Sequence, residues 1–177
     1  MRMAKRSVWK GALAGAAAGL AGTIAMTQFQ NLWSKASEKL THNGGHDSSS
    51  KQSEAEKEDA TMKAAGKLAE LARHRISRDE KKKAGPIIHY AFGTGMGAIY
   101  GALVEVGPRD LRRHDLLSGL GFGSVLFAGA DELVVPALGL SGKPSQSPAS
   151  SHLYGLASHL VYGVTAGAVR KALRTAL

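Results

Sequence analysis

The chain has 177 residues, with 23 Lys and Arg against 14 Asp and Glu and no Cys. That length suits one compact domain, or about four hydrophobic spans of roughly 20 residues with their connections. The lack of Cys excludes disulfides, thiolate metal sites and thiol nucleophiles. The basic residues do not alternate with aromatic residues as in a stacking platform for bases, so we expect no nucleic-acid partner.

The first uncharged stretch, 24 residues between Lys10 and Lys35, predicts a membrane-crossing helix. The chain's two Trp residues, Trp9 and Trp33, flank it. In a helix they would lie about 36 Å apart, close to the spacing of the two aromatic belts of a membrane protein. A cleaved signal peptide is the alternative, because MRMAKR supplies a basic start. The run is longer than a usual signal core, so we assign residues 1–34 to a basic start and a first span.

Residues 35–83 form a charged hydrophilic loop that holds 21 of the charged residues. Its first part, THNGGHDSSSKQS, has the composition of a flexible linker. From Ser53 to Arg78, apolar residues recur at helical spacing, namely Ala64, Ala65, Leu68, Leu71, Ala72 and Ile76. The pattern predicts an amphipathic helix in this loop. It either lies on the membrane surface, with Arg and Lys toward anionic headgroups, or stays solvated.

Residues 84–177 are predicted to hold three further spans. The second span runs from Ala84 to Val104, and Pro86 suits its first helical turn. The fourth span lies within the uncharged run from Pro144 to Val169, and basic residues follow it directly. Each of these two stretches is long and apolar enough for one crossing.

The third span is less regular than the others. It begins at Leu116, and Asp131 and Glu132 interrupt it before apolar residues continue to Gly142. We expect the helix to bend or end near Pro136, because proline lacks the N–H that a helix interior requires.

Glycine distinguishes a membrane bundle from a soluble one. Of the 22 Gly, 18 lie in the four apolar stretches, and in a water-soluble helix each would cost about 1 kcal/mol relative to Ala. Membrane helices use glycine for close backbone approach. Many lie four residues apart in GxxxG or glycine-zipper patterns: Gly11, Gly15, Gly19, Gly93, Gly97, Gly101, Gly119, Gly123, Gly163 and Gly167. We predict an all-α polytopic membrane protein, a four-helix transmembrane bundle with glycine-rich packing. A peripheral glycine-zipper protein is the alternative.

Five ionisable residues fall within the predicted spans: His89, Asp131, Glu132, His152 and His159. In an antiparallel bundle, the start of the second span, the end of the third and the start of the fourth lie on one side, so these residues can converge. Such a group could relay protons, bind a cation or hold a divalent metal. Alternatively, the acids end the third span at the interface, and the histidines bind headgroups or backbone carbonyls.

Four spans place both termini on one side of the membrane. The distribution of Lys and Arg does not clearly indicate whether that side is cytoplasmic. Ten lie on the side of the termini, against twelve in the first connection and Lys143. We expect cytoplasmic termini because the basic segment MRMAKRSVWK leads the first helix.

Part of the second half resembles a known family. The segments are HYAFGTGMGAIYGAL from His89 to Leu103, the acids Asp131 and Glu132 followed by Pro136, and SHLYGLASHLVYG from Ser151 to Gly163. Together they resemble the YagU-like family of small bacterial inner-membrane proteins of unknown function. The resemblance implies an inner-membrane location and assigns no chemistry to any residue.

Three classes of function follow from these observations. We favour a packing or assembly module in the lipid bilayer, whose glycine faces bind a second copy or another membrane protein. Proton or small-ion handling by the polar residues is the alternative. We do not expect an enzyme, a cofactor or a metal site, because the sequence lacks paired metal motifs, a Gly-x-Ser-x-Gly elbow and a phosphate-binding loop.

Overall fold

The computed structural model describes residues 7–41 and 58–176, and every regular element in these ranges is a helix. The prediction of an all-α protein is confirmed. The long helices are α1 (Val8–Thr41), α4 (Arg78–Val106), α8 (Ala149–Ala176) and a continuous helix made of α6 (Asp115–Leu126), η1 (Phe127–Val134) and α7 (Val135–Ala137). The short helices are α3 (Ala60–Leu71), α5 (Arg109–Arg113) and η2 (Pro144–Gln146).

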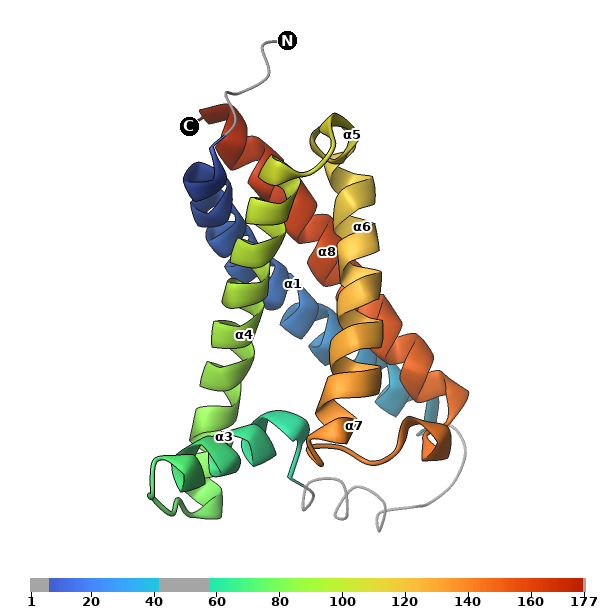
Figure 1. Ribbon diagram of the computed structural model, residues 1–177. Helices are drawn as coiled ribbons and strands as arrows, with labels where there is room; N and C mark the ends of the chain where they lie inside the picture. Colours follow the sequence, from blue (N-terminus) through green and yellow to red (C-terminus); the bar gives the residue numbers. More distant parts are fainter. Residues whose placement is uncertain (1–6, 42–57, 177) are drawn as a thin grey trace.

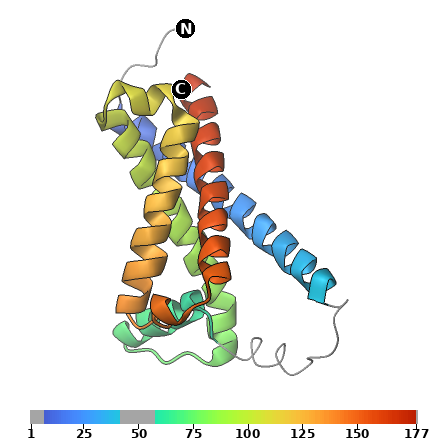
Figure 2. The same cartoon turned by 90° about the vertical axis from the view of Figure 1, so that its right-hand side faces the viewer.

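The long helices pack side by side and run antiparallel in chain order (Figure 1). Helix α1 lies against α4 and α8, and α6 packs against α8. One end of the molecule, which we call the α5 end, holds α5, the start of α1 and the end of α8. The opposite end, the α3 end, holds α3, α7 and the start of α8. The final part of α1 is exposed, and Figure 2 shows it slanting away from the other long helices.

Three of the described helices are long and apolar enough to cross a membrane: Val8–Lys39, Arg78–Val106 and Asp115–Ala137. They correspond to the first three predicted spans and indicate a membrane protein. Helix α8 has 28 residues but is not one of the three. The fourth crossing therefore stays a prediction.

Helix α4 begins earlier than the sequence pattern indicates. We expected the second span to start at Ala84, but the helix starts at Arg78 behind a capping box. The Ser77 amide donates to the Glu80 carboxylate at 2.7 Å, and the Glu80 amide donates to the Ser77 hydroxyl at 3.3 Å. These two bonds satisfy N–H groups at the helix start. Pro86 consequently lies inside α4 rather than in its first turn, a position that membrane helices tolerate.

The amphipathic helix of the first loop is shorter than expected. The pattern predicted a helix from Ser53 to Arg78, and the structure has α3 over Ala60–Leu71. Asp59 caps its start by accepting a hydrogen bond from the Met62 amide at 2.8 Å. Arg73, with φ of 57°, ends it in the left-handed region. Residues 42–57, which include most of the predicted linker, lie outside the described residues.

The third span passes its two acids without a break. Asp131 and Glu132 lie in η1, a π-helix of eight residues, in which hydrogen bonds skip one residue more than in an α-helix. The Val135 amide accordingly donates to the Ala130 carbonyl. The expected end near Pro136 is confirmed within two residues, since the helix stops at Ala137 rather than continuing to Gly142.

Glycines line the contacts between the long helices. Gly11, Gly15 and Gly19 of α1 face Gly93, Gly97 and Gly101 of α4. An added Cβ on Gly15 would collide with the Gly97 carbonyl, and one on Gly97 would collide with the α1 backbone. Between α6 and α8, Gly119 and Gly123 lie against Gly163 and the backbone around it in the same way. The core beside these contacts consists of Ala18, Met26, Tyr100, Val104, Leu126, Tyr162 and Ala166.

Candidate functional site

Three of the five predicted polar residues meet in the half of the bundle nearer the α3 end. They are His89 of α4, Asp131 of η1 and His159 of α8, which we call the histidine–aspartate cluster. The Nδ1 atom of His159 lies 3.7 Å from a carboxylate oxygen of Asp131. His89 is close enough to both for their charges to interact. Three separate helices therefore bring one titratable group each within electrostatic range of the others.

His159 is the most enclosed member of the cluster, with 7% of its side chain exposed. Its Nδ1 lies 2.9 Å from the Gly155 carbonyl one turn earlier. Because a carbonyl can only accept, Nδ1 carries the hydrogen, and in neutral His159 the lone pair is on Nε2. His159 can therefore accept a proton without breaking its bond to the backbone.

His89 contributes a buried polar atom. Its Nε2 is enclosed and has no hydrogen-bond partner in the described part of the chain. A buried imidazole nitrogen without a partner is unfavourable, and such atoms usually have a ligand, an ion or a water in the working protein. The ring packs edge-on against Tyr90, with the ring centres 5.9 Å apart.

The other two predicted residues, Glu132 and His152, form a separate pair. The Nδ1 atom of His152 lies 2.7 Å from a Glu132 carboxylate oxygen, and its Nε2 lies 3.1 Å from the Pro144 carbonyl. The Pro144 carbonyl accepts from Nε2, and with Glu132 ionised a protonated imidazole donates from both nitrogens. The pair links η1, which carries Glu132, to the start of α8, which carries His152.

The two acids lie in the π-helix η1 and reach different partners. Asp131 and Glu132 are neighbours in the sequence, yet one approaches His159 and the other bonds His152. Pro136 contributes to this register because it has no N–H to complete the next helical bond. π-turns are frequent at functional sites, and here the turn supplies one acid to each histidine.

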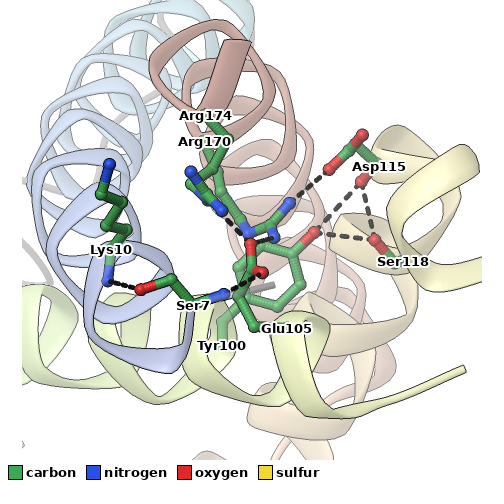
Figure 3. A network of polar contacts seen from close by, with 8 residues as sticks. All are labelled: Ser7, Lys10, Tyr100, Glu105, Asp115, Ser118, Arg170 and Arg174. Carbon is green, nitrogen blue, oxygen red and sulfur yellow. Dashed lines mark hydrogen bonds and ion pairs between the residues drawn. The ribbon is translucent and has the colours of Figure 1, made fainter. Parts of the chain in front are cut away.

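A second polar site, absent from the sequence predictions, lies at the α5 end (Figure 3). Arg170 of α8 donates to Asp115 at 2.7 Å and to Glu105 at 2.9 Å. Arg174 donates to the same oxygen of Glu105 at 2.8 Å. The Ser7 amide, just before α1, donates to the other Glu105 oxygen at 3.3 Å. We call Glu105, Asp115, Arg170 and Arg174 the ion network.

The ion network is almost completely buried and electrically balanced. Its four charged side chains are 2 to 7% exposed, with two acids against two arginines. Tyr100 extends it, because its hydroxyl lies 2.8 Å from Ser118 and donates to the Asp115 carbonyl at 3.2 Å. Breaking a buried pair by removing one partner is strongly destabilising. The network therefore holds the ends of α1, α4, α6 and α8 together.

Sequence reasoning missed the network because its members look like ordinary span ends. Glu105 follows the second predicted span, and Arg170 and Arg174 follow the fourth, where charges are expected. The available signal was spacing: Arg170 and Arg174 are four residues apart and share one helix face. Pairing them with Glu105, which is 65 residues before Arg170, required the fold.

Among the residues that the structure describes, no three His, Asp or Glu side chains form a group that could hold a metal ion. Comparisons with protein-family models, curated proteins and solved structures found no match to this chain. The geometry of the two polar sites is therefore the basis on which a function can be proposed.

Proposed function

We propose that the chain is a four-span inner-membrane protein that handles protons, or a small cation, at the histidine–aspartate cluster. The observation that carries the proposal is the 3.7 Å approach of His159 to Asp131 from two helices, beside a buried and unpaired Nε2 of His89 on a third. Ionisable side chains inside membrane spans are costly and usually serve a function.

The proposal includes a fourth crossing by α8. This helix lies between α1 and α6, both of which belong to candidate spans, so it runs through the same layer as they do. Its 28 residues extend about 42 Å, enough to cross a bilayer. Two of the five predicted polar residues, His152 and His159, lie on this helix and lower its hydropathy. The resemblance to the YagU-like family and the basic start support an inner membrane with cytoplasmic termini.

The chemistry of the cluster suits reversible proton binding. A proton that reaches the Nε2 of His159 makes an imidazolium, whose charge Asp131 stabilises from 3.7 Å. His89 offers a second imidazole within electrostatic range. Asp131, with 45% of its side chain exposed, is the member of the cluster that a proton or cation from outside the bundle would reach first.

Proton flux into liposomes tests this proposal. The purified protein is reconstituted around a pH-sensitive dye, and a pH gradient is imposed. Wild-type protein should dissipate the gradient faster than empty liposomes. Asp131→Asn or His159→Gln should slow the flux by about a hundredfold, the lower range of what a positioned proton-transfer group contributes.

Asp110→Asn is the matched control, because Asp110 lies on α5 with 79% of its side chain exposed. It should leave the flux unchanged. Flux no faster than in empty liposomes, with either a proton or an alkali-cation gradient, would overturn the proposal. So would an Asp131→Asn variant that transports as well as the wild type.

Assembly with a second copy or another membrane protein is the second candidate function. The glycines that we first assigned to partner binding face one another inside the chain, so a partner must use another surface. The third candidate span is less buried inside the protein than the first two. Of its most apolar part, 11% is buried, against 39% and 28% in the first and second spans. Gly121 and Gly129 of this span have open space around an added Cβ. The outer face of α6 and η1 is therefore the surface for such a contact.

A further inference from the structure

The connection between α3 and α4 carries a basic and apolar surface that the proton proposal does not use. Arg73, His74 and Arg75 are exposed, and the neighbouring Leu68 and Leu71 of α3 are 53% and 81% exposed. We call these five residues the basic corner. Neither Arg73 nor Arg75 forms an ion pair with another described residue.

The fold fixes the basic corner at the level where a membrane span begins. Helix α3 lies across the α3 end of the molecule (Figure 1). It packs against the first turns of α4, where an added Cβ on Gly85 would meet Thr61 and Met62. Lys67 on α3 also donates to the Leu138 carbonyl just beyond α7. Helix α3 is thus held beside the ends of two candidate spans, where polar headgroups meet acyl chains.

The backbone at Arg73 is strained. Its φ of 57° places it in the left-handed region, which costs a residue other than glycine about 1 kcal/mol. Arg73 follows Ala72, the C-cap of α3, at a position where glycine is the usual residue. The amides of Arg73 and His74 close the helix by donating to Glu70 and Ala69 at 2.9 and 2.8 Å. Glycine would make the same turn without strain, so the fold alone does not account for an arginine here.

We propose that the basic corner binds the phosphate groups of anionic lipids in the adjacent leaflet. Arg73 and Arg75 supply the charge, and arginine suits phosphate because its guanidinium can donate two parallel hydrogen bonds. Leu68 and Leu71, three residues apart on α3, supply the apolar contact with the acyl boundary. An anionic leaflet fits both parts of this surface, whereas an acidic protein partner would leave the two leucines without an explanation.

Lipid retention by the full-length protein tests the proposal. The protein is purified in detergent, titrated with phosphatidylglycerol or phosphatidylcholine, and examined by native mass spectrometry. Wild-type protein should bind phosphatidylglycerol more tightly, with an affinity that falls as salt rises. Arg73→Gln with Arg75→Gln should weaken phosphatidylglycerol binding about thirtyfold, because each arginine near an anionic surface contributes a factor of about five.

Arg109→Gln with Arg113→Gln is the matched control, since it removes the same charge from α5 at the opposite end. This control should retain more than half of the wild-type affinity. Equal losses in the two double variants would show that net charge alone attracts lipid and would overturn the assignment. Equal affinity of the wild type for the two lipids would overturn it as well.

Arg73→Gly separates binding from folding. It should raise the thermal unfolding midpoint, because it removes the strain, and lower the affinity for phosphatidylglycerol about fivefold. Unchanged lipid affinity in this variant would exclude Arg73 from the binding surface. A lowered midpoint would show that its side chain serves the fold instead. The proposal rests on the membrane-spanning part of the proposed function, but neither readout depends on proton flux, so a failure of lipid binding and a failure of proton handling are distinguishable.

Discussion

Arg170 forms ion pairs with two acids on two other helices, so this one side chain connects three helices at the α5 end. It reaches Asp115 and Glu105 at the same time and is 3% exposed. Its Nε has no partner among the described residues, so the bonds at its two terminal nitrogens carry the interaction. A charge of this kind is tolerated in an apolar interior only while its partners stay in place.

Arg170→Leu should therefore destabilise the protein by about 3 to 5 kcal/mol, because two buried carboxylates lose a shared partner. Thermal unfolding in detergent micelles measures the effect. Arg113→Leu is the control, since Arg113 is 62% exposed and its change should stay within about 0.5 kcal/mol. An Arg170→Leu protein with the wild-type midpoint would mean that the ion network does not hold the helices together.

At the scale of elements, the sequence predicted the long helices well and their ends poorly. Uncharged stretches located α1, α4 and the third span, because apolar length is a strong signal. Helix ends depend on local capping: the Ser77 and Glu80 box extends α4 backward, and the turn at Arg73 shortens α3. The π-turn in the third helix has no composition signal beyond Pro136.

The glycines between α1 and α4 give an element-scale prediction. Gly97→Ala should destabilise by about 1 to 3 kcal/mol, because the new Cβ would collide with the backbone of α1 at Gly15 and Gly19. Gly95→Ala, on the same helix with open space around the new Cβ, should be neutral or stabilise by up to about 1 kcal/mol. Thermal unfolding of both variants checks this. Equal effects would show that α1 and α4 are not in glycine contact.

At the scale of the whole molecule, the two ends differ in chemistry. The α5 end is closed by a balanced, buried ion network, and the α3 end carries the histidine–aspartate cluster and the basic corner. Antiparallel topology predicted which ends of the spans lie together, and so that the polar residues could converge, but not which acid would approach His159. It also could not predict that Glu132 would pair with His152, nor that Glu105 and Asp115 would share Arg170.

Disulfide crosslinking tests assembly of the whole molecule, because the chain has no Cys of its own. If a second copy binds the outer face of α6 and η1, Gly121→Cys should form a disulfide-linked dimer in native membranes. Val8→Cys, at the start of α1 and half exposed, is the control and should stay monomeric. Only monomer with both variants, and no other crosslinked membrane protein, would remove the assembly function.

The ion network also constrains how the protein enters the membrane. Glu105 and Asp115 reach the bilayer with α4 and α6, but their cationic partners belong to α8, which is made later in the chain. Until α8 arrives, two acids at the ends of the earlier helices remain without their arginines. Synthesis stopped before α8 should leave an intermediate that stays near the insertion machinery or is degraded. Arrival of α8 therefore completes the ion network.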